Sequence, residues 1–145
     1  MGCSKDFKYK YKELFKMWEI EKAILLTNND KVVAKFGDTI KCIMCKNYEE
    51  VMIKTRDMVY TGHKLLTHPQ ASSLKPNQTL YRSVIIYPKE GEDNTEDIML
   101  IEKCVETFRQ WQNIAKSPES YPEKVANDFK TIDLSVIENV IPRIC

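Results

Sequence analysis

The sequence predicts a small layered α/β domain: a short, mostly parallel three-stranded sheet flanked by helices, with helical additions at both ends of the chain. Three short apolar runs, Ala23–Thr27, Ile40–Cys45 and Tyr81–Tyr87, are typical of strands buried on both faces. Segments with helical spacing of apolar residues lie around and between them. Because strands and helices alternate, parallel pairing through helical crossovers is the expected arrangement.

The N-terminal segment is predicted to be an amphipathic helix over residues 4–18. Phe7, Tyr11, Leu14 and Trp18 fall on one face of such a helix. Several lysines decorate the same segment. They indicate either a basic arm for an acidic partner or a solvated helix face, and the apolar stripe favours the second interpretation because it explains the helix without a partner.

Two further helices have terminal signals in the sequence. A short helix is expected over Asp30–Phe36, after the turn that follows the first strand and with Gly37 at its end. A longer helix is expected to begin at Asn47, with Glu50 as its capping-box partner, and to end at Gly62.

The C-terminal half is predicted to be helical after the third strand. Apolar residues spaced from Ile98 to Phe108 predict one helix, and Pro122 is suited to start a second through about Phe129. Asp133 is expected to cap a last short helix that stops near Pro142. We expect one domain over residues 1–145, made of the helix at 4–18, an α/β core at 22–115 and a helical extension at 116–145.

The composition of the chain limits the classes of protein to which it can belong. The chain has 145 residues and a formal net charge of +1, and 43% of its residues are hydrophobic, which suits one globular domain. A charge near zero gives no global attraction to nucleic acid or acidic membranes. No apolar run approaches the ~20 residues that span a bilayer, and the N-terminus lacks the apolar stretch of a secretory signal. We therefore expect a cytoplasmic protein that binds neither nucleic acid nor membrane.

The five cysteines are Cys3, Cys42, Cys45, Cys104 and Cys145. Without an export signal no disulfide framework is expected. The CxxC pair falls on a predicted strand, where residues three apart face opposite sides, and no second pair completes a zinc site. The pair is therefore interpreted as two core thiols.

The segment from Gly62 to Ser83 is the most informative part of the chain. Pro69 and Pro76 predict a loop. It contains both histidines together with lysines, an arginine and several hydroxyl groups. A loop that only connects two elements is usually shorter and has fewer reactive side chains. We expect it to form a site near Asn28 and Asn29, because ligands of open α/β sheets bind outside the carboxyl ends of the strands.

His63 and His68 allow three interpretations. As metal ligands they would need a third donor, such as Asp57 or one of the cysteines, and their spacing is not a standard one for zinc, so no metal is predicted. As general acids or bases they have a suitable intrinsic pKa, but no nucleophile signature lies nearby. As structural groups they pin a long loop through hydrogen bonds. Both stay candidate catalytic residues if the protein is an enzyme.

Positive charge clusters around the same loop. Arg56, Lys64, Lys75 and Arg82 can hold a carboxylate or phosphate through charge-assisted bonds, with Lys64 and Lys75 facing water as the alternative. Arg56 and Asp57, neighbours on one helix, are not expected to face each other. The candidate ligand-binding residues are Asn28, Asn29, Arg56, Asp57, His63, Lys64, Thr67, His68, Ser73, Lys75, Asn77, Thr79, Arg82 and Ser83.

Several common motifs are missing from the sequence. It contains no dinucleotide-binding glycine pattern, P-loop, nucleophile elbow or zincin motif. Aromatic and basic residues do not alternate as they do on RNA-binding strands. We therefore expect no cofactor.

Several segments together resemble the GrdX family: Ile24–Asn29, Arg56–Asp57, Gly62–Pro69, Ser73–Thr79 and Tyr81–Ser83. The most specific part is His-Lys-Leu-Leu-Thr-His-Pro followed by Lys-Pro-Asn. The resemblance covers roughly residues 23–112, so the N-terminal helix and the tail after Ser117 look like additions. Members of this family are encoded beside the glycine reductase machinery of amino-acid-fermenting anaerobes, which reduces glycine, sarcosine or betaine by selenoprotein and thiol chemistry. The resemblance implies an accessory role and carries over no catalytic residue.

The expected function is therefore binding of a small anionic ligand, an amino acid or a phosphorylated metabolite, by an accessory protein of an amino-acid reductase system. A protein of the reductase complex is the other expected partner. Two alternatives stay open. One is an enzyme of unknown reaction that uses His63 or His68 as acid–base. The other is a protein–protein accessory factor without a small-molecule site, docking through the N-terminal helix.

Overall fold

The computed structural model describes residues 19–70, 79–88, 93–112 and 121–144. The helix expected over residues 4–18 lies outside the described residues. The elements follow in the order β1 (Ile24–Thr27), α2 (Asp30–Phe36), β2 (Lys41–Met44), α3 (Tyr48–Tyr60), β3 (His63–Leu65), β4 (Ser83–Pro88), α4 (Thr95–Gln112) and α5 (Glu123–Ile144). The protein is a mixed α/β structure, as expected from the alternation of strands and helices.

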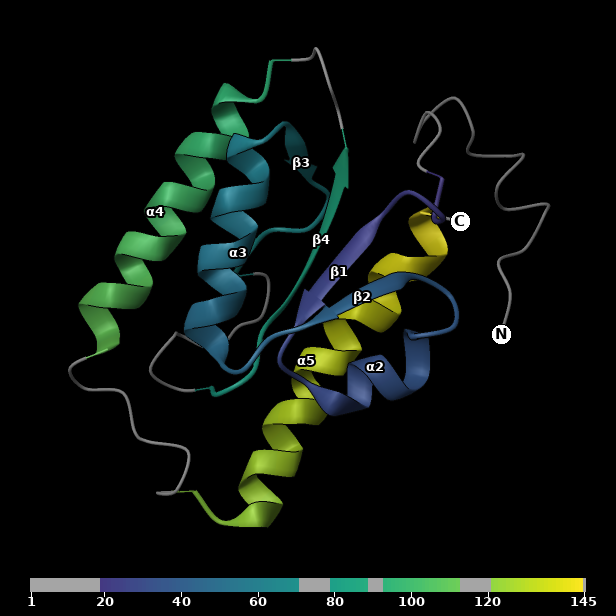
Figure 1. Cartoon of the computed structure of the whole chain (residues 1–145). Helices are drawn as coiled ribbons and strands as arrows, with labels where there is room; N and C mark the ends of the chain where they lie inside the picture. Colours follow the sequence, from purple (N-terminus) through teal and green to yellow (C-terminus); the bar gives the residue numbers. More distant parts are fainter. Residues whose placement is uncertain (1–18, 71–78, 89–92, 113–120, 145) are drawn as a thin grey trace.

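The sheet differs from the expected one. It has four strands in the order β2-β1-β4-β3, and it is mixed (Figure 1). β1 pairs in parallel with β2, whereas β4 is antiparallel to both β1 and β3. The prediction of a mostly parallel three-stranded sheet is therefore wrong in strand number and in direction.

The missed strand β3 explains the error. It pairs antiparallel with β4, which is antiparallel to β1, so β3 runs in the same direction as β1 and β2. α3 thus connects two strands that run in the same direction, β2 and β3, at opposite edges of the sheet, and β4 then returns between β1 and β3. β3 was not recognised because a three-residue strand has too few positions for an alternating pattern.

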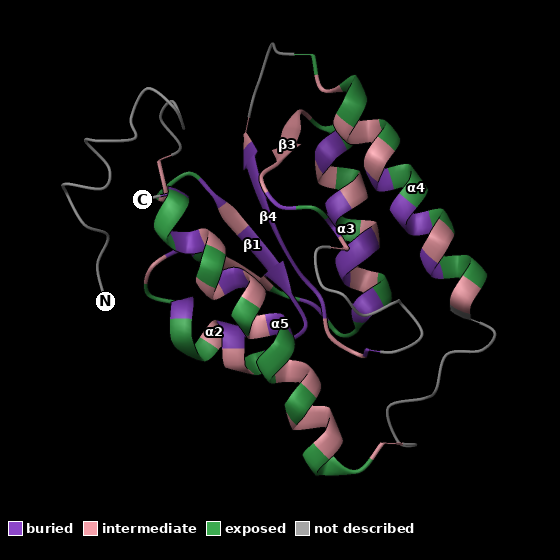
Figure 2. Ribbon diagram, turned by 180° about the vertical axis from the view of Figure 1, so that it is seen from behind, coloured by how far each residue is buried: buried purple, intermediate pink, exposed green. Residues whose placement is uncertain are grey.

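Helices cover both faces of the sheet and form two cores (Figures 1 and 2). On one face, α3 and α4 pack against side chains that alternate along the strands, such as Leu26 and Val84. On the other face, α2 and α5 pack against the intervening side chains, such as Leu25 and Ile85. Since β1 and β4 contribute to both cores, the central strands are buried on both faces, as their apolar sequences predict.

The helix boundaries of α2 and α3 agree with their local signals. Asn29 caps α2 through its side chain, and Gly37 ends it. Asn47 caps α3, where its Oδ1 accepts a hydrogen bond from the Glu50 backbone N–H at 2.8 Å. Gly62 follows α3 with a φ of 104°, a left-handed conformation that only glycine adopts without strain.

The C-terminal region is one helix where two were expected. α5 is continuous from Glu123 to Ile144 and includes Pro142 in its last turn. Asp133 caps nothing; it is a buried residue in the middle of the helix. Ile137, Ile141 and Ile144 belong to the core on their side of the sheet, so α5 is a structural layer of the fold. No helix in the described ranges is long and apolar enough to cross a membrane.

Candidate functional site

Polar residues gather where β1 ends and β4 begins. Thr27 and Ser83 are register partners at this edge of the sheet. The edge holds the carboxyl ends of the parallel strands, which is where open α/β sheets bind ligands. We call the following residues the strand-end cluster: Thr27, Asn28, Asn29, Arg82, Ser83 and Asp133. Each of them is buried or at the limit of burial.

Four members of the cluster form a closed hydrogen-bonded ring on the face covered by α2 and α5. The Ser83 hydroxyl donates to Asp133 Oδ2 at 2.6 Å. Thr27 Oγ1 lies 2.7 Å from Ser83 Oγ and accepts from the Asn29 backbone N–H at 3.0 Å. Asn29 Nδ2 closes the ring by donating to Asp133 Oδ2 at 3.1 Å. Because Ser83 uses its proton on the carboxylate, Thr27 donates to Ser83.

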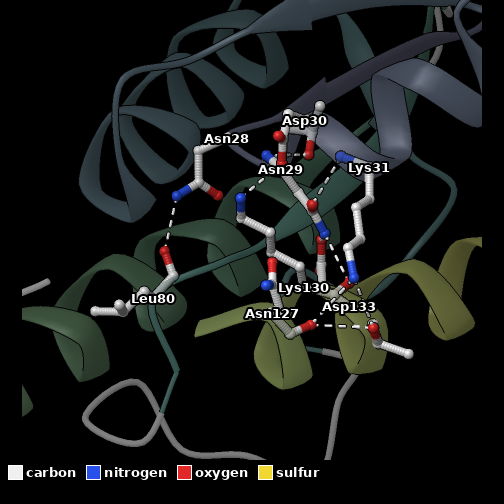
Figure 3. Close-up of polar contacts among 10 residues, drawn as sticks. Asn28, Asn29, Asp30, Lys31, Leu80, Asn127, Lys130 and Asp133 are labelled. Carbon is white, nitrogen blue, oxygen red and sulfur yellow. Dashed lines mark hydrogen bonds and ion pairs between the residues drawn. The ribbon is translucent and has the colours of Figure 1, made fainter. Parts of the chain in front are cut away.

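The side chains of Asn28 and Asn29 bind different parts of the chain (Figure 3). Asn29 joins β1 to α5, since its Nδ2 also donates to the Lys130 carbonyl oxygen at 2.8 Å. Asn28 ties β1 to the segment that enters β4. Its Nδ2 donates to the Leu80 carbonyl oxygen at 2.7 Å, and its Oδ1 accepts from the Arg82 backbone N–H at 2.9 Å. The two amides therefore fix the ends of both central strands.

Asp133 is only 4% exposed. Burial raises the pKa of its carboxyl group above the usual value, against the lowering effect of the hydrogen bonds from Ser83 and Asn29 and of the positive charge of Arg82. The Asp133 carboxyl group therefore keeps its proton to a higher pH than the carboxyl group of a surface aspartate does.

Arg82 occupies the opposite face of the sheet, beside α3. Its side chain is 2% exposed. Its Nε donates to the Tyr48 hydroxyl at 3.1 Å, and its guanidinium carbon lies 5.2 Å from the Tyr48 ring centroid. Tyr48 in turn stacks on Phe108 of α4, with 4.8 Å between the ring centroids. A buried guanidinium is thus held against an aromatic ring, an arrangement suited to arginine.

The rim of the cluster includes a surface ion pair. Lys130 Nζ lies 2.9 Å from Asp30 Oδ1, which lowers the pKa of Asp30. The same ammonium group lies 5.4 Å from the Tyr81 ring centroid. Lys31 Nζ points to α5 and donates to the Asn127 carbonyl oxygen at 3.4 Å. These contacts fasten the start of α2 to α5 (Figure 3).

The two histidines do not join the cluster. His63 pairs with Pro88 at the far end of β4, about 17 Å along the strand from Ser83. Its Nδ1 lies 2.9 Å from the Met58 carbonyl oxygen, so that nitrogen is the protonated one. His68 is exposed, and its Nδ1 accepts from the Gln70 backbone N–H at 3.0 Å. Each histidine thus has a local structural contact.

The predicted cations are also apart. Lys64 Nζ lies 3.7 Å from Asp97 Oδ2, at the same far end of the sheet as His63. Arg56 Nε lies 3.8 Å from Glu102 Oε1 and 3.6 Å from Asp57 Oδ1. The expectation that Arg56 and Asp57 do not face each other was wrong. Of the charged side chains predicted for the site and described in the structure, only Arg82 lies in the cluster.

The remaining predicted residues belong to the loop. Thr67 is buried, and its Oγ1 accepts from the Ile85 backbone N–H at 2.9 Å. Thr79 is also buried, and its Oγ1 accepts from the Tyr81 backbone N–H at 3.2 Å. Ser73, Lys75 and Asn77 lie outside the described residues. Thr67 and Thr79 thus shape the two arms of the loop beside β4.

Two residues of the site, Asp133 and Tyr48, were not predicted from the sequence. Asp133 lies on the same face of α5 as Ile137 and Ile141, so a carboxylate within an apolar helical stripe was the available signal. Tyr48 directly follows the Asn47 cap, and no local pattern distinguishes it from an ordinary core aromatic residue. Neither role is visible without the tertiary contact to β4.

The described cysteines are buried or half-buried structural thiols. Cys42 packs toward the core of α2 and α5, whereas Cys45 belongs to the core of α3 and α4, so the two face opposite sides of the sheet. Burial raises the pKa of both and raises the pKa of Cys104 to about 11. Within the described residues no three His, Cys, Asp or Glu side chains gather as a metal site.

The fold and the cluster define a class: a layered α/β domain with a buried polar cluster at the carboxyl end of its first strand. The family model described as GrdX-like protein matches residues 24–142. The chain therefore belongs to the GrdX-like family. No curated protein and no solved structure matches it. Since the match extends through most of α5, the C-terminal helix is part of the family domain, which corrects its interpretation as an addition.

Proposed function

We propose that this protein is an accessory protein of a glycine-type reductase system in the cytoplasm, and that it binds a small anionic or amino-acid-like ligand at the strand-end cluster. Family membership supports the association with the reductase system. The observation that supports ligand binding is the buried guanidinium of Arg82 at the sheet edge where this class of fold binds ligands.

Arg82 supplies the positive charge in this proposal. A guanidinium in a site of low polarity binds a carboxylate or phosphate more strongly than it does in water. Asn28 holds the Arg82 backbone, and Tyr48 holds its Nε. A ligand would replace part of the contacts that Arg82 makes in this structure.

The histidines favour this proposal over an enzyme that uses one of them as acid–base. His63 lies at the other end of β4, and His68 binds the neighbouring backbone. General acid–base catalysis needs a group within hydrogen-bond reach of the reacting atoms. Within the described residues, no hydrogen bond joins either imidazole to a member of the strand-end cluster.

Thermal unfolding in the presence of glycine, sarcosine, betaine, acetate or inorganic phosphate tests the proposal. A ligand at about one hundred times its Kd stabilises the folded state by roughly 2.7 kcal/mol, which corresponds to a rise in Tm of about 5–10 °C for a chain of this size. The rise should saturate with concentration. Isothermal titration calorimetry then gives the affinity and stoichiometry.

Matched variants separate specific binding from general solute effects. Arg82→Gln should abolish the saturable rise, and Tyr48→Phe, which keeps the ring that supports Arg82, should weaken it. Lys64→Gln removes a cation at the far end of the sheet and should leave it unchanged. No saturable rise with any compound, or an equal rise in Arg82→Gln, would refute ligand binding at this site.

A further inference from the structure

Two buried groups of opposite charge lie on opposite faces of β4 at neighbouring positions. Arg82 packs against Tyr48 on the α3 side. The next residue, Ser83, binds the Asp133 carboxylate on the α5 side. Both charged side chains are almost fully buried, so water screens their interaction weakly. The state of one charge therefore affects the other.

The ring around Asp133 permits a change of protonation without rearrangement. Both side-chain donors, the Ser83 hydroxyl and Asn29 Nδ2, bind the same oxygen, Oδ2. A proton on Oδ1 would leave both hydrogen bonds in place. Asp133 can therefore gain or lose a proton while α5 stays attached to β1 and β4.

The other charged groups around Asp133 compensate one another or are engaged elsewhere. From α5, Lys130 is paired with Asp30 of α2. Lys31, also on α2, donates to the Asn127 carbonyl oxygen and to Thr131 Oγ1. From the sheet, the positive charge of Arg82 acts on the carboxyl group of Asp133. Arg82 is therefore the charge through which a ligand would influence this acid.

We propose that binding of an anion at Arg82 is coupled to uptake of one proton by Asp133. The inference rests on the proposed ligand binding and adds how that site is regulated. An anion neutralises the guanidinium and removes the positive charge that favours the ionised carboxylate. The proton comes from solvent and binds Oδ1. The protein thus takes up ligand and proton together, and acidification favours the bound state.

Calorimetric titration with glycine or sulfate between mildly acidic and mildly alkaline pH tests the coupling. Where Asp133 titrates, affinity should increase by up to about tenfold per pH unit of acidification, the limit for one proton per ligand. The measured heat should depend on the ionisation enthalpy of the buffer. Asp133→Asn, which imitates the neutral acid, should bind with an affinity independent of pH and close to that of the wild type at low pH.

Asp30→Asn is the matched control, because it removes a carboxylate on the rim of the same cluster that is 68% exposed. It should keep the pH dependence of the wild type. Binding without any pH dependence in the wild type, or an equal dependence in Asp133→Asn, would overturn the coupling.

A measurement without ligand separates this inference from the proposed function. Carboxyl carbon resonances from nuclear magnetic resonance report the titration of Asp133 directly. The Asp133 pKa should be higher in Arg82→Gln than in the wild type, since the variant lacks the positive charge. An unchanged pKa refutes the coupling whether or not a ligand binds. A raised pKa with no binding by any probe refutes the proposed function alone. If Arg82→Gln does not fold, calorimetry on the wild type and Asp133→Asn decides.

Discussion

Removal of the Ser83 hydroxyl is the sharpest test of the ring around Asp133. In Ser83→Ala the buried carboxylate loses its shortest hydrogen bond, at 2.6 Å, and keeps the one from Asn29 Nδ2 at 3.1 Å. The Thr27 hydroxyl also loses its acceptor at 2.7 Å. A hydrogen bond to a charged group contributes about 1.5–3 kcal/mol. We therefore expect the free energy of unfolding to fall by about 2–3 kcal/mol, and Tm by roughly 4–10 °C.

A double-mutant cycle shows whether the charge of Asp133 is responsible. In an Asp133→Asn background the acceptor is neutral, so Ser83→Ala should cost only about 1 kcal/mol, typical of a neutral hydrogen bond. Urea unfolding should show a shifted midpoint with an unchanged slope. Ser135→Ala, an exposed serine on α5 that bonds the Ile132 carbonyl oxygen, should change stability by less than about 0.5 kcal/mol. Equal costs of Ser83→Ala in both backgrounds, within about 0.5 kcal/mol, would refute the reasoning.

Three further predictions concern pH, backbone conformation and thiol reactivity. Burial raises the Asp133 pKa in the folded protein, so its contribution to stability is complete below its unfolded-state pKa of about 3.9 and is lost as pH rises through the folded-state value. Urea unfolding should thus show the wild type losing stability relative to Asp133→Asn from acidic to neutral pH, and a constant difference would contradict this. Gly62→Ala should cost about 1–2 kcal/mol in chemical denaturation through its φ of 104° alone, since no atom lies within 4 Å of the added Cβ; a neutral effect would show that the turn relaxes. Cys104 is 2% exposed, with a pKa of about 11, so mass spectrometry should find it alkylated by iodoacetamide at neutral pH only after unfolding, and rapid modification of the folded protein would contradict its burial.

Local signals predicted the elements whose ends are fixed by nearby residues. Asn47 and Gly62 mark α3 because a cap and a left-handed glycine act within one turn of the helix. β3 was missed because it depends on pairing with β4, for example Lys64 with Tyr87, far along the chain. Local spacing cannot show such a pairing.

The same distinction applies to the candidate site. Asn28 and Asn29 were predicted because they follow the first apolar strand, and Arg82 and Ser83 because they belong to the cationic, hydroxyl-rich segment that leads into the last strand. Asp133 was interpreted as a helix cap, since short polar side chains favour that position. Its partners are Asn29, which lies between β1 and α2, and Ser83 of β4, which are 104 and 50 residues earlier in the chain. Its role therefore depends on tertiary structure.

The C-terminal helix has a consequence for how the chain reaches its native state. Ile137 and Ile141 of α5 share one face of the sheet with α2, so in a chain that has been synthesised only as far as α4 the apolar side chains that α5 packs against are still exposed. This core is therefore complete only after the last segment has left the ribosome, because α2 alone supplies part of its helical layer. A nonsense codon between α4 and α5 would give a fragment with an exposed apolar sheet face, which is prone to self-association.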